Sequence, residues 1–390
     1  MEGNTPLEVV MLPWSAFGHL TPFFQLSIAL AEAGVHVSFI STPKNIQRLP
    51  KIPSTLAHLV DFVEFPLPSL DKEHLPEGAE ATVDIPPEKI QDLKVAYDQL
   101  QHPVKQFVLN HSPDWIISDF CSHWVVEIAQ EFQIELMFSP VVSAASTVFF
   151  GLSELLGGYG EGKLPLELES LTRIPEYVKF PSAVESLSAV AYQKHEALLM
   201  HPGQNASGIA DGLRAVKLLH ACQAVAIRSC YEIEGKYLNL CQKITKKPVI
   251  PVGLLPSKGS KREITEGSWG KMFGWLDKQA PKSVVFVGFG SECTLKKDKI
   301  FEIAYGLELS QLPFLWALRK PSWAIDDEDS LPPGFAERTS NRGIVCMGWV
   351  PQREILAHPS IGSSLFQSGW GSVIETLQFG HNLLVLPFYN

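Results

Sequence analysis

Leu7-Glu-Val-Val-Met-Leu12 and Val35-His-Val-Ser-Phe-Ile-Ser41 are the segments that decide the fold class of this chain. Both are short apolar runs with β-branched residues, which is typical of strands buried in a sheet. Between them, residues 13–19 are predicted to be a loop, and Pro22 opens a helical pattern that Gly34 closes. A strand, a helix and a second strand in this order predict a parallel α/β unit.

The alternation of strands and helices continues and then restarts behind a proline-rich segment. Further strands are predicted at 115–118, 136–139, 224–228, 283–287, 314–318, 343–346, 363–366 and 383–386, and further helices at 122–132, 298–309, 353–357 and 372–379. Residues 246–268 have the prolines and polar residues of a linker. We therefore expect two Rossmann-like, doubly wound α/β domains facing a cleft, 1–245 and 269–390, the second incomplete. Residues 151–212, with a helical patch at 188–199, are expected to elaborate the first domain.

The composition argues against several classes of protein. A net charge of −10 without a Lys/Arg cluster argues against a nucleic-acid partner. The six cysteines form no Cys-x-x-Cys pair, so we expect free thiols in a reducing compartment. The N-terminus lacks a signal-peptide pattern, and no apolar run approaches the length of a membrane span. We expect a cytoplasmic monomer.

The segment Gln367-Ser-Gly-Trp-Gly-Ser372 lies between a predicted strand and a predicted helix. Glycines allow the backbone to approach a ligand, and a helix N-terminus favours a diphosphate. Ser372 adds a hydroxyl, Glu375 one turn later can accept from ribose hydroxyls, and Trp349 offers a flat face for a base. The alternative is that Trp349 and Trp370 are core aromatics and that the glycines only form turns.

His19 and Asp119 both follow predicted strands of the first domain, so we expect them to lie at one edge of the sheet. An imidazole titrates near neutral pH and can take a proton from an acceptor hydroxyl, and a carboxylate can orient it. The alternative for His19 is a helix-capping or core histidine.

The ordered pattern from Trp349-Val-Pro-Gln352 to Gln367-Ser-Gly-Trp-Gly-Ser372 and Glu375 resembles the nucleotide-sugar box of plant family-1 UDP-glycosyltransferases. The resemblance implies the GT-B type of fold, a UDP-sugar donor, and His19 and Asp119 as a catalytic pair. In it, Trp349 stacks on uracil, Gln352 and Glu375 contact the ribose, and Ser372 binds the diphosphate. The donor-binding set implied by the resemblance is Ser291, Trp349, Val350, Gln352, Gln367, Gly369, Trp370, Gly371, Ser372 and Glu375.

The N-terminal half resembles the UDP-rhamnose:rhamnosyltransferase subgroup of that family. The segments that carry this likeness are Pro13-Trp-Ser-Ala-Phe-Gly-His-Leu-Thr-Pro22, Ser41-Thr-Pro-Lys-Asn-Ile-Gln-Arg-Leu-Pro50 and Pro113-Asp-Trp-Ile-Ile-Ser-Asp-Phe120. Gly371, which stands where Asn is commoner in the family, also fits the subgroup.

Two departures from the family pattern bear on activity. Gln367 stands where the box has His, and an uncharged amide makes a weaker hydrogen bond to phosphate, so we expect weakened donor binding. The box ends with an Asp/Glu-Gln pair that grips the sugar, and the sequence stops at Asn390, before that pair. We therefore expect a chain truncated within the box.

The resemblance implies inverting transfer of glucose or rhamnose to a hydroxyl of a small lipophilic plant metabolite, such as a flavonoid or terpenoid glycoside. Candidates to line the acceptor pocket are Trp14, Phe17, Phe120 and Phe149. One alternative is an inactive, truncated relative that keeps acceptor binding only. A second alternative is a nicotinamide-dependent enzyme. It is disfavoured because this chain has no Gly-x-Gly-x-x-Gly motif after its first strand. The acidic residues 326–329 are predicted to be a solvated loop, and neither metal nor cofactor is expected.

Overall fold

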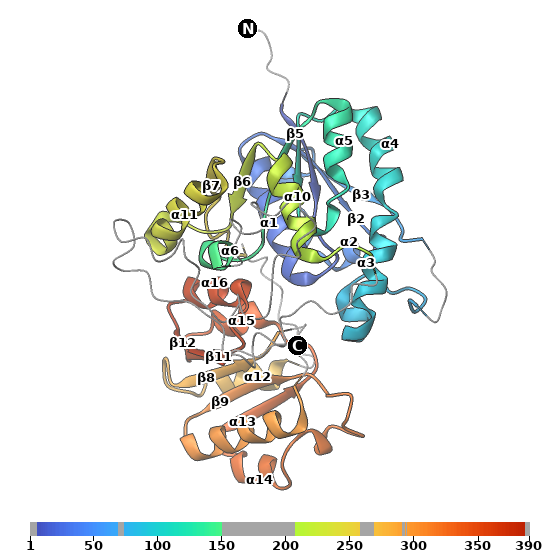
Figure 1. Ribbon diagram of the computed structural model, residues 1–390. Helices are drawn as coiled ribbons and strands as arrows, with labels where there is room; N and C mark the ends of the chain where they lie inside the picture. The colour runs from blue at the N-terminus through green and yellow to red at the C-terminus, as the bar shows by residue number, and fades with distance from the viewer. Residues whose placement is uncertain are drawn as a thin grey trace. The chain divides into compact units, whose positions relative to one another are not determined.

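The computed structural model describes residues 6–68, 74–149, 207–257, 269–290, 293 and 295–386 of the chain. The chain divides into two compact units, Met1–Leu255 and Pro256–Asn390 (Figure 1). Within the described residues, no helix has the length and apolar character needed to cross a membrane.

The first unit is built on a parallel sheet in the order β3-β2-β1-β4-β5-β6-β7. Its strands are β1 (Glu8–Leu12), β2 (His36–Ser41), β3 (Val60–Glu64), β4 (Trp115–Ser118), β5 (Glu135–Phe138), β6 (Ala224–Ile227) and β7 (Val249–Pro251). Its α-helices are α1 (Phe17–Glu32), α2 (Pro43–Arg48), α3 (Ile90–Asp98), α4 (Gln101–His111), α5 (Val125–Phe132), α6 (Ala144–Phe149), α10 (Asp211–Ala221) and α11 (Tyr231–Thr245), and its short 3-10 turns are η1 (Ser54–Leu56), η2 (Thr82–Asp84), η3 (Pro87–Lys89) and η4 (Phe120–Ser122).

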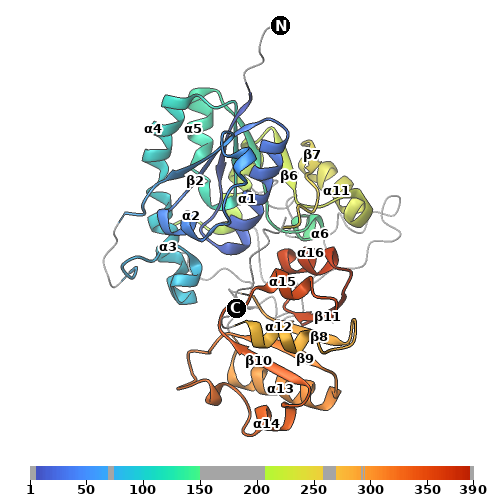
Figure 2. The same ribbon diagram turned by 180° about the vertical axis from the view of Figure 1, so that it is seen from behind.

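Apolar clusters cover both faces of this sheet. Successive side chains of a strand point to opposite faces, so a strand such as β1 contributes to both clusters. Val10 and Leu12 of β1 belong to one apolar cluster, together with residues of α3, α4, α5 and α10. Val9 and Met11 belong to the other cluster, which α1 covers. Figures 1 and 2 show these helices on the two sides of the sheet.

The second unit repeats this design around the parallel order β10-β9-β8-β11-β12. Its strands are β8 (Val284–Gly288), β9 (Phe314–Leu318), β10 (Gly343–Met347), β11 (Ile361–Phe366) and β12 (Asn382–Val385), and its helices are α12 (Gly270–Leu276), α13 (Lys297–Ser310), α14 (Phe335–Thr339), α15 (Gln352–Leu356) and α16 (Trp370–Gln378), with the 3-10 turn η6 (Glu328–Ser330). Val285 and Val287 pack on one face, and Val284 and Phe286 pack on the other.

The start of α1 differs from the sequence prediction. The helix begins at Phe17, five residues before Pro22, so His19 lies in its first turn and not in a loop. Pro22 has no N–H to donate to the carbonyl of Gly18. Because Gly18 is exposed, the loss of this one hydrogen bond does not leave a buried carbonyl unpaired, and the helix tolerates Pro22 near its start.

The predicted domain boundaries also change. Residues 246–268 were expected to be a linker, but Val249–Pro251 forms β7 and pairs with β6. The first sheet therefore does not end with the strand predicted at 224–228, and the division between the units falls at Leu255 and Pro256. Two prolines near the three-residue strand concealed it, because proline usually marks a loop. The helical patch predicted at 188–199 lies outside the described residues.

Candidate active site

The first constellation forms where β1 and β4 end. The two strands are neighbours and parallel, with Leu12 opposite Ser118. The backbone N–H of Asp119 donates to the carbonyl of Leu12 at 3.1 Å. Because the strands end side by side, the start of α1, which carries His19, lies beside the start of η4, which Asp119 caps. The predicted proximity of His19 and Asp119 is what the sheet register produces.

Asp119 is a buried carboxylate with three partners. Only 1% of its surface is exposed. Its Oδ1 accepts from the backbone N–H of Phe120 at 2.7 Å, and its Oδ2 accepts from the backbone N–H of Trp14 at 3.1 Å. The same Oδ2 lies 2.5 Å from Nδ1 of His19. Since an ionised carboxylate only accepts hydrogen bonds, the proton of a neutral His19 belongs on Nδ1, which leaves the lone pair on Nε2.

The His19 side chain is 23% exposed and packs against an aromatic ring. Its ring centroid lies 5.6 Å from that of Phe120, whose own face lies 5.8 Å from the ammonium of Lys94. A partly exposed imidazole, oriented by a buried carboxylate, has the arrangement of a general base. The alternative of a capping histidine does not fit, because the helix N-cap is Ala16, and the 23% exposure of the His19 side chain does not fit a fully buried core histidine.

The aromatic residues expected to line an acceptor pocket divide into two groups. Trp14 is a core residue that packs edge-on against Tyr97 at 5.2 Å between ring centroids, so it is not available to a ligand. Phe17 and Phe120 are both partly exposed. Phe17 lies two residues before His19 in the chain, and the ring of Phe120 packs against the ring of His19. The side chain of Phe149 lies outside the described residues.

The second constellation lies in the other unit, at the ends of β10 and β11. Trp349 is 71% exposed, which excludes the core alternative for this residue. The side chain of Val350, which was assigned to the donor site from sequence, is buried in the apolar cluster of α12 and α15, so a contact with the donor would have to come from its backbone. Gln352 opens α15, and its Nε2 donates to Oε2 of Glu375 on α16 at 2.8 Å. Two residues predicted to share one ligand group are therefore in direct contact.

The loop between β11 and α16 has an unusual backbone and two buried polar atoms. Ser368 has a φ of 74°, and Gly369 is the N-cap of α16. Oε1 of Gln367 and Oγ of Ser368 are buried without a hydrogen-bond partner among the described residues. Such atoms cost about 1–3 kcal/mol each when left unpaired. The loop therefore holds hydrogen-bonding capacity that none of its described neighbours uses.

A glycine brings the loop after β8 against this segment. A Cβ on Gly290 would lie 2.8 Å from Nε2 of Gln367, and Gly290 has a φ of +70°. The left-handed backbone favours glycine at this position, and an added Cβ would displace the flexible end of the Gln367 side chain. Ser291, the next residue and a predicted phosphate contact, lies outside the described residues.

The first turn of α16 contains the remaining predicted donor residues, Trp370, Gly371 and Ser372. The first intrahelical bond runs from Val373 N to Gly369 O at 3.0 Å. Gly371 is exposed, and Ser372 is partly exposed. The positive end of the helix dipole therefore lies at an accessible turn, which is a suitable place for an anion.

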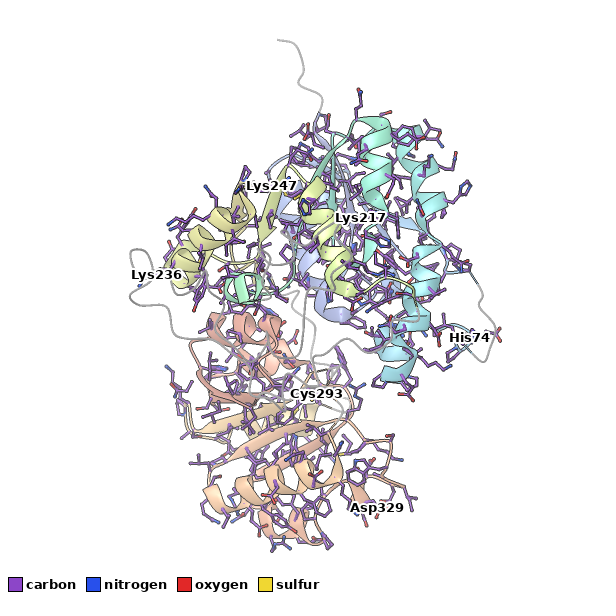
Figure 3. All side chains as sticks on the ribbon, in the orientation of Figure 1. His74, Lys217, Lys236, Lys247, Cys293 and Asp329 are labelled. Carbon is purple, nitrogen blue, oxygen red and sulfur yellow. The ribbon has the colours of Figure 1, made fainter. Side chains whose placement is uncertain are left out.

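The acidic run 326–329 forms a surface turn in the second unit. Its residues are exposed, and Asp326 Oδ1 accepts from the backbone N–H of Asp329 at 2.9 Å. Figure 3 shows Asp329 at the periphery of this unit. Across the described part of the chain, no group of three His, Cys, Asp or Glu side chains is arranged to hold a metal ion.

Tyr97 contacts the first constellation and was not identified from the sequence. Its hydroxyl donates to the carbonyl of Pro13 at 2.9 Å, in the connection from β1 to α1. Burial raises the pKa of Tyr97 well above its ordinary value, so the hydroxyl remains protonated and donates. The only signal in the sequence is an aromatic residue on an amphipathic helix, which does not distinguish it from other core residues.

Comparisons with known proteins agree on one family. The family model described as UDP-glucoronosyl and UDP-glucosyl transferase matches residues 271–390. UDP-glycosyltransferase 91C1 of Arabidopsis thaliana is 39% identical over 387 residues, covering 98% of this chain and 80% of that protein. The soyasaponin III rhamnosyltransferase of Glycine max is 38% identical over 391 residues, covering 99% of this chain and 79% of that protein.

Solved structures agree on the fold. Apo UGT2 of Phytolacca americana is 25% identical, with a TM-score of 0.72, and the match covers 99% of this chain and 82% of that one. UGT89C1 of Arabidopsis thaliana, complexed with UDP-L-rhamnose, is 24% identical, with a TM-score of 0.68 and coverage of 98% and 80%. Two Rossmann-like units, the expected GT-B type of fold, are therefore confirmed.

Proposed function

The chain belongs to the UDP-glycosyltransferase family, and from this premise we propose that it moves glucose or rhamnose from a UDP-sugar to a hydroxyl of a small lipophilic plant metabolite, with inversion at the sugar carbon. Sugar transfer from a UDP-sugar follows from the family. The acceptor class, the stereochemistry and the roles of individual residues are the proposal. The observation that carries it is the contact between His19 and the buried carboxylate of Asp119.

The acceptor side of the reaction depends on His19. Its Nε2 takes the proton of the acceptor hydroxyl as the oxygen attacks the anomeric carbon of the sugar. The bond from that carbon to the diphosphate oxygen breaks, and UDP leaves with the electron pair. Asp119 holds the ring and stabilises the imidazolium, and the two backbone N–H groups that bind Asp119 keep the carboxylate in place.

The donor side of the reaction depends on the second unit. The exposed ring of Trp349 offers a stacking face for uracil, and the pair of Gln352 and Glu375 offers polar atoms to the ribose. The first turn of α16, with the hydroxyl of Ser372, would stabilise the leaving diphosphate electrostatically. Ser291 is proposed as a further phosphate contact on the family pattern alone. We propose no metal ion or cofactor in this reaction.

The relatives narrow the choice of sugar and acceptor. One of them is named a soyasaponin III rhamnosyltransferase, at 38% identity, which makes UDP-rhamnose and saponin acceptors reasonable substrates to test. Flavonoids remain in the panel because the proposed acceptor is a small lipophilic compound with a hydroxyl group.

The test is a transfer assay on monodisperse protein, with UDP-glucose and UDP-rhamnose against flavonoid and terpenoid glycoside acceptors. His19→Ala should lower kcat/KM by about 10²–10⁴-fold, the range of a general base. His36→Ala is a matched control, because it breaks another histidine–carboxylate contact of the same sheet, 2.7 Å to Glu8, at the strands' amino ends.

Transfer that His19→Ala abolishes and His36→Ala spares supports the proposal. Transfer that survives His19→Ala contradicts the proposed base. A folded protein that binds acceptor but transfers no sugar from either donor would instead favour an inactive relative that retains acceptor binding only.

A further inference from the structure

The end of α3 contacts both connections that carry the proposed catalytic pair. Tyr97 and Asp98 are the last two residues of this helix. The Tyr97 hydroxyl bonds the carbonyl of Pro13, which is the first residue after β1 and leads into the helix of His19. This hydroxyl is buried, so the bond is shielded from competition with water.

Asp98 reaches the other connection through a buried arginine. The guanidinium of Arg214, on α10, is 0% exposed and binds Asp98 through two parallel bonds of 2.7 and 2.5 Å. Its Nη1 also donates to the carbonyl of Cys121 at 2.8 Å. Cys121 is the second residue after Asp119, so a single guanidinium links α3 to the turn that Asp119 caps.

A histidine completes the environment of this guanidinium. Nδ1 of His123 lies 3.0 Å from Nη1 of Arg214, which can only donate, and 3.2 Å from the carbonyl of Cys121, which can only accept, so the tautomer of the ring decides which contact is a hydrogen bond. Burial and the neighbouring Arg214 charge lower the pKa of His123, which agrees with a neutral ring. The guanidinium donates to the Asp98 carboxylate and to the Cys121 carbonyl from one planar group, and lysine cannot reproduce this geometry.

We infer that Tyr97 and Arg214 are positioning residues that fix the His19–Asp119 geometry from the end of α3. Each donates to a backbone carbonyl just beyond a strand end, where the sheet no longer sets the path of the chain. Neither side chain contacts His19 or Asp119 in the bonds described above, so each acts through its connection. A displacement of about 1 Å between reacting groups can cost roughly 10²-fold in rate.

This inference rests on the proposed function, and the test separates the two. The main variant is Tyr97→Phe, which removes one hydroxyl and keeps the ring. Arg214→Lys is the second variant and keeps the charge while losing the fork. The matched control is Lys217→Met on the same helix as Arg214, which removes a surface contact with Glu127; Figure 3 shows Lys217 on this helix.

Two readouts are measured on each variant. One is the proton NMR signal of the His19 Nδ1–H, which the short contact with Asp119 should move far downfield and which His19→Ala should remove. The other is kcat against the KM of the acceptor. We expect Tyr97→Phe to shift or broaden the NMR signal and to lower kcat about 10- to 100-fold, with KM within about twofold. Lys217→Met should leave both readouts unchanged.

The outcomes distinguish the inference from the proposed function. If Tyr97→Phe lowers only the melting temperature, and leaves the NMR signal and kcat as in the parent, the positioning role is wrong even though transfer occurs. If the parent transfers no sugar but Tyr97→Phe still moves the His19 signal, the positioning role stands and the proposed function fails. If Arg214→Lys does not fold, Tyr97→Phe alone decides.

Discussion

The two constellations differ in how far their polar atoms are paired. In the first unit, both oxygens of Asp119 accept hydrogen bonds and one lies 2.5 Å from His19. In the second unit, the loop before α16 buries Oε1 of Gln367 and Oγ of Ser368 without partners among the described residues. The first arrangement is set by the protein's own contacts, whereas the second offers hydrogen bonds that a ligand could complete. We therefore expect substitutions in the first to change rate and substitutions in the second to change donor affinity.

The largest expected effect comes from Asp119→Asn. The amide keeps the size of the side chain but would favour the wrong tautomer of His19, and kcat should fall about 10³–10⁴-fold, as for other carboxylates that orient a base. UDP affinity should be unchanged. Steady-state kinetics and calorimetric UDP titration measure the two quantities. A loss of UDP affinity that parallels the loss of rate would erase the expected difference between the units.

A smaller effect is expected from Glu375→Gln in the second unit. Replacing a charged acceptor by a neutral one weakens a hydrogen bond by about 1 kcal/mol, so the Kd of UDP should rise roughly fivefold to tenfold. The rate with bound donor should change little. Glu302→Gln, an exposed site on α13, is the matched control. Lower kcat with unchanged UDP affinity would contradict a binding role for Glu375.

Gln367→His tests the same loop in the opposite direction. A protonated imidazole can replace the neutral amide as a donor to phosphate, and UDP affinity should increase several-fold at pH 6. The gain should disappear as pH rises above about 7, because imidazole ordinarily loses its proton near pH 6.5. The parent should show no such pH dependence. UDP titrations at pH 6 and pH 8 measure this, and an equal change at both pH values would contradict the electrostatic explanation.

The smallest kinetic effect is expected at Asp84, which lies in neither constellation. Burial raises its pKa, but hydrogen bonds from Arg48, the backbone of Glu80 and Lys44 outweigh burial and hold the pKa at about 2. A carboxylate whose pKa is lowered by folding stabilises the fold at pH values above its pKa in the unfolded chain, 3.8. This stability is lost as the pH falls through the folded-state pKa of about 2.

Asp84→Asn should therefore lower the free energy of unfolding by about 2 kcal/mol at pH 7, with kcat within about twofold of the parent. Denaturant titrations at pH 7 and at pH 2 measure the difference, which should shrink at the lower pH. A constant difference at both pH values would show that Asp84 acts through packing and not through charge.

The buried parallel strands were the most predictable part of the fold. The predictions at 115–118 and 314–318 match β4 and β9, because a short, nearly continuous apolar run is typical of a strand buried on both faces. The start of α1 was misplaced, since Pro22 is tolerated inside its second turn, and β7 was missed behind prolines. Local patterns therefore identified strands buried in the middle of a sheet better than a helix start or a short strand next to prolines.

The candidate site was predictable where it depends on strand ends and not where it depends on side-chain packing. His19 and Asp119 could be paired because parallel strands end at one edge. The side chain of Val350 is buried although Trp349, the residue before it in the motif, is exposed, and the local pattern does not show this difference. Tyr97 and Arg214 lie about 80 or more residues from the backbone carbonyls that they bind, and no local pattern carries that information.

The most direct test is calorimetric titration of UDP into the parent protein and into His19→Ala, in the buffer used for the transfer assay. If the first unit carries the chemistry and the second unit binds the donor, the Kd of UDP should agree within about twofold between the two proteins. Turnover by His19→Ala should fall by at least about 100-fold. A Kd that rises together with the loss of turnover, or turnover that survives without His19, would contradict this division of roles.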